Sequence, residues 1–226
     1  MARCPTTKTV LLAGASGLVG RALLTQLLAA PDTRVHALLR REVPDLPVTP
    51  HLSRQLIDFV QPFALPRADL LYIALGTTLK AAGSEAAFRA VDFDAVVNVA
   101  RAARAAGVRR AAVVSALGAD AGSRVFYNRT KGEMEAQLAE LGFERLIVAR
   151  PSLLVGDRGA LGQARRVGEQ LAVTLLAPIS RLLPARVRPI DAAVVARAMC
   201  TALERPGASI QIIESAALQA LGTGLP

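Results

Sequence analysis

The chain has no tryptophan, and aromatic side chains supply only 4% of its 226 residues. It therefore lacks the interleaved aromatic groups on which single-stranded nucleic acids stack. Hydrophobic residues make up 52% of the chain and charged residues 20%, which excludes the disordered class. Without large aromatics, the core has to be filled by alanine, leucine, valine and isoleucine, as is typical of a parallel sheet covered by helices.

Cysteine is also scarce, since only Cys4 and Cys200 are present. Two distant cysteines are too few for a disulfide framework or a zinc site, and His36 and His51 have no partners at metal-ligand spacing, so we expect no metal. The chain shows no apolar signal-peptide run and no stretch of the ~20 apolar residues that a membrane span needs. The nearest is residues 171–183, interpreted as a lid, a core helix or a docking surface. We therefore expect a cytoplasmic protein without a membrane span.

Lysine is the third scarce residue type. Lys8, Lys80 and Lys131 are the only lysines, so arginine carries nearly all of the net charge of +9. A basic balance suggests nucleic-acid binding. The arginines are scattered from Arg3 to Arg205, however, and the densest group falls at the end of a predicted helix, where basic side chains favour the helix dipole. We therefore expect no direct nucleic-acid partner.

A short apolar strand leads straight into three glycines spaced G-x-x-G-x-x-G, and a helix is predicted after them. Gly14 makes the tight turn, Gly17 lets backbone approach a phosphate, and Gly20 lets the helix lie close to the sheet. The free N–H groups of the helix N-terminus then hold a pyrophosphate. The alternative is a plain strand–turn–helix of any α/β protein. We predict that this turn binds a dinucleotide through Gly14, Ser16, Gly17, Leu18, Val19 and Gly20.

Strand and helix patterns alternate along the chain, which indicates an α/β protein with a doubly wound parallel sheet. The predicted strands are Val10–Ala13, Arg34–Leu39, Arg54–Phe59, Leu70–Leu75, Arg110–Ala116, Leu146–Ala149 and Ile210–Ile213. The predicted helices are Leu18–Ala30, Glu85–Ala106, Val125–Leu141, Leu161–Leu176 and Ala192–Glu204. Right-handed crossovers give the Rossmann-like order 3-2-1-4-5-6, with the last strand a candidate seventh.

We expect one NAD(P)-binding domain over residues 1–226, in which residues 152–191 and 205–226 contribute a small C-terminal cap on the substrate side. The stretch 42–50 contains three prolines, so the second crossover is predicted to be a loop.

Ser115, Tyr127 and Lys131 are the candidate catalytic residues. Ser115 ends the fifth strand, and Tyr127 and Lys131 stand four apart on the next helix, so they share one face. A nearby ammonium lowers the pKa of a tyrosine, which can then exchange a proton with a substrate hydroxyl or carbonyl. Ser115 would hold the substrate oxygen. The spacing is common on ordinary helix surfaces, and the glycine turn in the same chain is what favours a site.

These residues, with several further motifs, resemble the short-chain dehydrogenase/reductase superfamily in its extended or atypical branch. Within it, the chain is similar to the family of the Tat-interacting protein and its bacterial relatives. The further motifs are Ala74–Thr78, Val91–Asp92, Val114–Ala119, Lys131–Glu133, Arg150–Leu154, Gly156–Arg158 and Pro189–Asp191. The resemblance implies a Rossmann-like fold and NADP(H) binding, and leaves the substrate open.

The residues after the second strand favour NADP(H) over NAD(H). A carboxylate there would select NAD, whereas this chain has Arg40 and Arg41, and a guanidinium matches a 2′-phosphate. We predict that Arg40 makes this contact. The resemblance implies further cofactor contacts. They are Asp58 and Phe59 at the adenine, Ala74, Leu75 and Gly76 along the dinucleotide, Lys131 at the nicotinamide ribose and Pro151 beside the nicotinamide.

The chain departs from the superfamily pattern at Asp92, near where extended members often carry an asparagine. Asn98 lies one or two turns later along the predicted helix. It is either the counterpart of that asparagine or a solvated residue. The short C-terminal part argues against large nucleotide-sugar substrates.

We predict an NADP(H)-dependent oxidoreductase of the short-chain dehydrogenase/reductase type, acting on a small carbonyl or alcohol. The alternatives are an NADP(H)-binding regulatory or redox-sensing module, and an epimerase or dehydratase that retains its cofactor. Monomer and homodimer both remain open.

Overall fold

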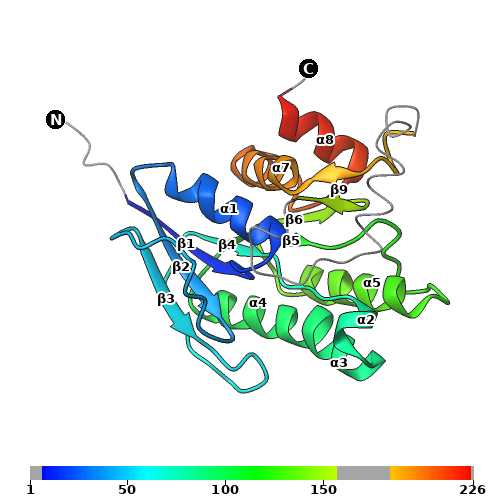
Figure 1. Cartoon of the computed structure of the whole chain (residues 1–226), viewed down its shortest axis with the longest axis horizontal. Helices are drawn as coiled ribbons and strands as arrows, with labels where there is room; N and C mark the ends of the chain where they lie inside the picture. The colour runs from blue at the N-terminus through cyan, green and yellow to red at the C-terminus, as the bar shows by residue number, and fades with distance from the viewer. Residues whose placement is uncertain (1–6, 157–183, 225–226) are drawn as a thin grey trace.

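The computed structural model describes residues 7–156 and 184–224. Its centre is a seven-stranded sheet in the order β3-β2-β1-β4-β5-β6-β9, in which neighbouring strands are parallel (Figure 1). The strands are β1 (Lys8–Ala13), β2 (Thr33–Leu39), β3 (Leu52–Leu56), β4 (Leu70–Ile73), β5 (Arg110–Val114), β6 (Arg145–Arg150) and β9 (Ile210–Glu214). The predicted doubly wound order is confirmed, and the strand at residues 210–213 is the seventh.

Helices cover both faces of this sheet (Figure 1). One layer consists of α1 (Leu18–Leu28), α7 (Ala192–Glu204) and α8 (Ser215–Thr223). The opposite layer consists of α2 (Leu79–Ala82), α3 (Glu85–Arg89), the π-helical turn η1 (Ala90–Asp94), α4 (Ala95–Ala105) and α5 (Phe126–Ala139). Two short strands, β7 (Leu154–Val155) and β8 (Ile190–Asp191), pair with each other beside the main sheet.

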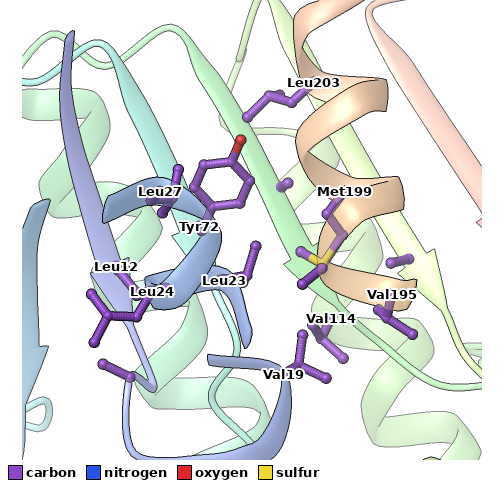
Figure 2. Close-up of a cluster of buried hydrophobic side chains, with 14 of the residues drawn as sticks. Leu12, Val19, Leu23, Leu24, Leu27, Tyr72, Val114, Val195, Met199 and Leu203 are labelled. Carbon is purple, nitrogen blue, oxygen red and sulfur yellow. The ribbon is translucent and has the colours of Figure 1, made fainter. Parts of the chain in front are cut away.

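Both faces of the central strands are buried, so β1, β2, β4, β5 and β6 each contribute to two cores. On β1, Val10 and Leu12 pack toward α1 and α7, whereas Leu11 and Ala13 pack toward α4 and α5. Successive side chains of a strand point to opposite faces, and helices on both faces make a parallel strand apolar throughout. Figure 2 shows the first core, where Tyr72 of β4 lies between α1 and α7. This packing fixes the ends of the strands, where the site lies.

The helix predicted over residues 85–106 is interrupted at η1, where the amide of Ala95 bonds to the carbonyl of Ala90. Such π-turns are rare in proteins, and those that occur are often found at functional sites. Helix α2 and strands β7 and β8, of two to four residues each, were too short to predict, and helix α8 was also not predicted. The loop predicted between β2 and β3 is confirmed, and Asp191 caps α7 by accepting from the amide of Ala193 at 2.6 Å.

The helix predicted at residues 161–176 and the segment 171–183 lie outside the described residues. In the part of the chain that the structure describes, every helix is too short or too polar to cross a membrane.

Candidate active site

A cleft of about 970 Å³ opens where the parallel strands end. This is the edge of a doubly wound sheet at which ligands bind. All sequence-predicted site residues except Gly20 line it. These are Gly14, Ser16, Gly17, Leu18, Val19, Arg40, Asp58, Phe59, Ala74, Leu75, Gly76, Ser115, Tyr127, Lys131 and Pro151. Residues from the two halves of the sheet thus share one cavity.

The glycine turn forms one wall of the cleft. The Gly17 amide donates to the Gly14 carbonyl at 2.9 Å, and α1 begins at the next residue, Leu18. Gly14 has a φ of 91°, and a Cβ there would overlap the carbonyl of Ala74 on the neighbouring chain segment. Gly20 lies outside the cleft, where a Cβ would overlap the Gly14 carbonyl oxygen, so its position is one of close packing. The turn therefore needs glycine for steric reasons at both ends.

The far end of the cleft carries the arginines that follow β2. Arg40 and Arg41 are both exposed and both line it. Asp58 accepts from the amide of Val60 at 3.0 Å, and Asn98 on α4 donates to the carbonyl of Phe59 at 2.9 Å. Asn98 is therefore a half-buried support for this loop rather than a solvated residue.

The other end of the cleft brings Ser115, Tyr127 and Lys131 together. Ser115 is the first residue after β5 and is buried, with its amide donating to the carbonyl of Ala149 at 2.7 Å. Tyr127 is half-buried in the first turn of α5, and its ring packs against that of Phe88 with centroids 5.3 Å apart. Lys131 follows one turn later and is 3% exposed.

Lys131 is held by a carboxylate that the sequence left undecided. Its Nζ lies 2.7 Å from Oδ1 of Asp92, and the two side chains are 4% and 1% exposed. The second oxygen of Asp92 accepts from the amide of Thr77 at 2.8 Å. The position of Gly76 borders this pair, since a Cβ there would lie 3.4 Å from Asp92 Oδ1. Asp92 thus ties α5, η1 and the loop after β4 together.

A second ion pair, between the buried Glu135 and the partly buried Arg150, lies one turn beyond Lys131. The Ser115 hydroxyl donates to Oε1 of Glu135, which is 7% exposed. Arg150, the last residue of β6, donates to Glu135 from Nε at 3.0 and 3.2 Å and from Nη2 at 2.6 Å. Its Nη1 reaches Glu214 at 3.1 Å. These carboxylates raise the pKa of the Arg150 guanidinium, with the hydrogen bond to Glu135 as the largest cause.

Sequence reasoning missed Glu135. Tyr127, Lys131 and Glu135 are spaced by four, so they form one stripe along α5. That spacing is visible in the sequence, but the partners of Glu135 come from β5 and β6 and are not. The stripe consists of a phenol, an ammonium and a carboxylate. The phenol can donate or accept a hydrogen bond, the ammonium only donates, and the carboxylate only accepts.

Comparison with known proteins identifies the family. A family model described as NAD(P)H-binding matches residues 14–172. Protein HTATIP2 of Rattus norvegicus is 32% identical over 222 residues, which cover 95% of this chain and 89% of that protein. Protein FMP52, mitochondrial, of Eremothecium gossypii is 36% identical over 150 residues, covering 66% of this chain and 67% of that protein.

Solved structures match the fold over most of the chain. WbmF of Bordetella bronchiseptica, in complex with NAD+, has a TM-score of 0.69 and 14% identity, covering 95% of this chain and 77% of that one. ADP-L-glycero-D-manno-heptose-6-epimerase of Helicobacter pylori has a TM-score of 0.68 and 15% identity, covering 93% and 77%. At these identities the likeness shows the fold.

The relatives overturn one expectation. The cytoplasmic location predicted from the sequence is contradicted, because the FMP52 relatives from Coccidioides immitis, Eremothecium gossypii and Emericella nidulans are named mitochondrial. The cysteine count on which that expectation rested does not separate the cytosol from an organelle. The family resemblance itself is confirmed: this chain belongs to the NAD(P)H-binding family and is related to HTATIP2 over nearly its whole length.

Proposed function

We propose that this protein is an NADP(H)-dependent oxidoreductase that acts on a small carbonyl or alcohol. The observation that carries the proposal is that Ser115, Tyr127 and Lys131 line the same cleft as the glycine turn. A dinucleotide laid along this cleft from the turn would bring its far end toward these three side chains.

The cleft fits such a cofactor. Its volume of about 970 Å³ is at the upper end of the range for small-molecule sites. The cradle at Gly14 and Gly17 has no side chain to exclude a phosphate, and the amides at the start of α1 would bind it. Arg40 would meet a 2′-phosphate, and Pro151 would border the ring. When bound, a nicotinamide cofactor supplies hydride-transfer chemistry.

The protein's own residues handle the proton. Tyr127 would exchange its phenolic proton with the substrate oxygen, and Ser115 would hold that oxygen beside it. Lys131 favours the phenolate because an ammonium stabilises a neighbouring negative charge. Asp92 holds Lys131 in place and at the same time offsets part of its charge, since the two groups are 2.7 Å apart and buried.

A carbonyl-substrate scan with NADPH tests this proposal, using Tyr127→Phe as the decisive variant. We expect turnover of at least one small carbonyl by the wild-type protein and a loss of at least about a hundredfold in Tyr127→Phe, the size of one acid–base contribution. Tyr72→Phe is the matched control, because Tyr72 is the other tyrosine and lies in the core outside the cleft. Activity that survives Tyr127→Phe contradicts the proposed proton transfer.

The preference for NADP(H) is tested at the two arginines after β2. Replacing Arg40 by glutamate should weaken NADPH binding by about 2–3 kcal/mol, because repulsion replaces a charge-assisted bond. NADH, which lacks the 2′-phosphate, should bind almost unchanged. Arg41→Glu is the matched control and should have the smaller effect. Equal NADPH affinity in the wild-type protein and Arg40→Glu would show that Arg40 does not contact the phosphate.

A regulatory NADP(H)-binding module is the second candidate. It is favoured by the buried pair of Lys131 and Asp92, because the carboxylate reduces the effect of the ammonium on Tyr127. This candidate predicts NADPH binding in calorimetry without turnover in the same scan. An epimerase or dehydratase that retains its cofactor would instead purify with the dinucleotide bound and would not consume it.

A further inference from the structure

Glu135 lies behind Ser115, outside the lining of the cleft, and has no role in the proposed proton transfer. It is the third member of the stripe on α5, it is 7% exposed, and it is the acceptor of the Ser115 hydroxyl. Two different strands supply its partners, because Ser115 follows β5 and Arg150 ends β6. The contact therefore joins the serine of the cleft to a buried charge behind it.

The direction of this hydrogen bond is fixed by Arg150. A guanidinium has donors only, and two of its nitrogens meet both oxygens of Glu135 at 2.6–3.2 Å. Paired in this way, Glu135 is a carboxylate and can only accept. The hydroxyl proton of Ser115 has to point toward Glu135, because a carboxylate oxygen has no proton of its own to give to this hydrogen bond. The face of Ser115 Oγ that remains for the cleft carries lone pairs.

We infer that Glu135 is a positioning residue that makes Ser115 a hydrogen-bond acceptor toward the cleft, so that the site binds a substrate hydroxyl better than a carbonyl in the ground state. This inference rests on the proposed function and ranks its two ligand classes, with the alcohol bound more tightly than the carbonyl. A hydroxyl can donate to the lone pairs of Ser115, whereas a carbonyl oxygen facing them cannot. A buried acceptor left without a donor is unfavourable, so the site distinguishes the two ligands.

Replacing Glu135 by glutamine should reverse this polarity. Two Arg150 nitrogens donate to Oε2, at 2.6 and 3.2 Å, so the amide oxygen is favoured at that position. The amide nitrogen then takes the position of Oε1 and faces Ser115, and Nε of Arg150 gives up its 3.0 Å contact there. Ser115 would then accept from Gln at this position, and its own proton would become available to the cleft. The variant keeps the shape of the side chain while it changes the preferred ligand from a hydroxyl to a carbonyl.

The experiment compares cyclohexanol and cyclohexanone as probes of the two ligand classes. Cyclohexanol is titrated into protein saturated with NADPH, and cyclohexanone into protein saturated with NADP+, so that no hydride can be transferred. The measured quantity is the ratio of the two dissociation constants. We expect the wild-type protein to prefer the alcohol, and Glu135→Gln to shift the ratio toward the ketone by about tenfold, the value of one hydrogen bond.

Two further variants separate positioning from a structural role. Glu214→Gln removes the other carboxylate that Arg150 binds, without changing the acceptor of Ser115, and should leave the ratio within about twofold of the wild-type value. In a Ser115→Ala background, Glu135→Gln should no longer shift the ratio, because the effect passes through the serine. An equal shift in Glu135→Gln and Glu214→Gln, or a shift that persists without Ser115, overturns the inference.

The outcomes also distinguish this inference from the proposed function. A wild-type protein that reduces a carbonyl with NADPH but shows no change of ratio in Glu135→Gln contradicts the role of Glu135 and leaves the oxidoreductase intact. A wild-type protein that binds neither probe in the presence of cofactor and reduces no carbonyl contradicts both.

Discussion

Replacing Asp92 by asparagine tests the buried charge pair that Asp92 forms with Lys131, one turn along α5 from Tyr127. The change keeps the size of the side chain and one oxygen for the amide of Thr77, which donates to Asp92 at 2.8 Å. It removes the negative charge that faces Lys131. An ammonium that is 4% exposed then lies in the protein without a charged partner.

The magnitude follows from the distance and the burial. At a separation of 2.7 Å and an effective dielectric constant of about 20, the gross attraction is about 6 kcal/mol. Desolvation of both groups opposes it, and measured costs of breaking one buried pair are about 3–5 kcal/mol. We expect Asp92→Asn to lower the free energy of unfolding by about 3 kcal/mol. This is the low end of the range for broken buried pairs, because the amide oxygen still accepts the hydrogen bond from Thr77.

Urea unfolding without cofactor measures this change directly, since bound NADPH would stabilise the native state by mass action. Glu144→Gln is the control, because Glu144 pairs with Arg109 at 3.0 Å with both side chains more than half exposed, and such pairs contribute about 0–1 kcal/mol. Replacing both members, as Asp92→Asn with Lys131→Met, should recover part of the loss. A loss in Asp92→Asn no larger than that in Glu144→Gln would refute the reasoning.

Two other predictions concern the packing of the fold, one at the glycine turn and one on α7. Gly20→Ala should destabilise the protein by more than about 3 kcal/mol in urea unfolding, because a Cβ there overlaps the Gly14 carbonyl and backbone has to move; a normal unfolding curve would contradict this packing. Burial raises the pKa of the Cys200 thiol, so less thiolate is present near neutral pH. Iodoacetamide should therefore label Cys200 at least about tenfold more slowly in the folded protein than in urea, as measured by mass spectrometry in a Cys4→Ser variant; equal rates would show that the thiol is exposed.

The sheet was predictable because its determinants are local. The apolar run of β1, the glycines after it and the four-residue spacing on α5 are patterns of neighbours in sequence, and right-handed crossovers leave few orders for parallel strands. The end of each strand then places Gly14, Ser115 and Pro151 on one edge.

The charges behind the cleft were not predictable in the same way. Asp92 reaches Lys131 from a π-turn that no periodicity marks, and Glu135 meets Ser115 and Arg150 only once β5 and β6 are adjacent. Such contacts join residues that are 15–39 positions apart in the sequence. They depend on where the folded chain places the charged ends of the side chains, which the spacing of neighbouring residues does not indicate. Sequence reasoning therefore located the cleft and left its supporting network open.

A calorimetric titration of NADPH into the wild-type protein and Gly17→Asp tests most directly whether the glycine turn binds a dinucleotide. Gly17 caps α1 with a φ of −84°, and a Cβ there would lie no nearer than 3.5 Å to its neighbours, so the fold should tolerate aspartate, which is a good N-cap. Its carboxylate would occupy the phosphate site, and like charges about 5 Å apart at an effective dielectric constant of about 20 repel by about 3 kcal/mol. We expect NADPH to bind the wild-type protein, to bind Gly17→Asp with an affinity at least about a hundredfold lower, and the variant to keep its stability in urea. Equal binding by both proteins, or no binding by the wild-type protein, would contradict this expectation.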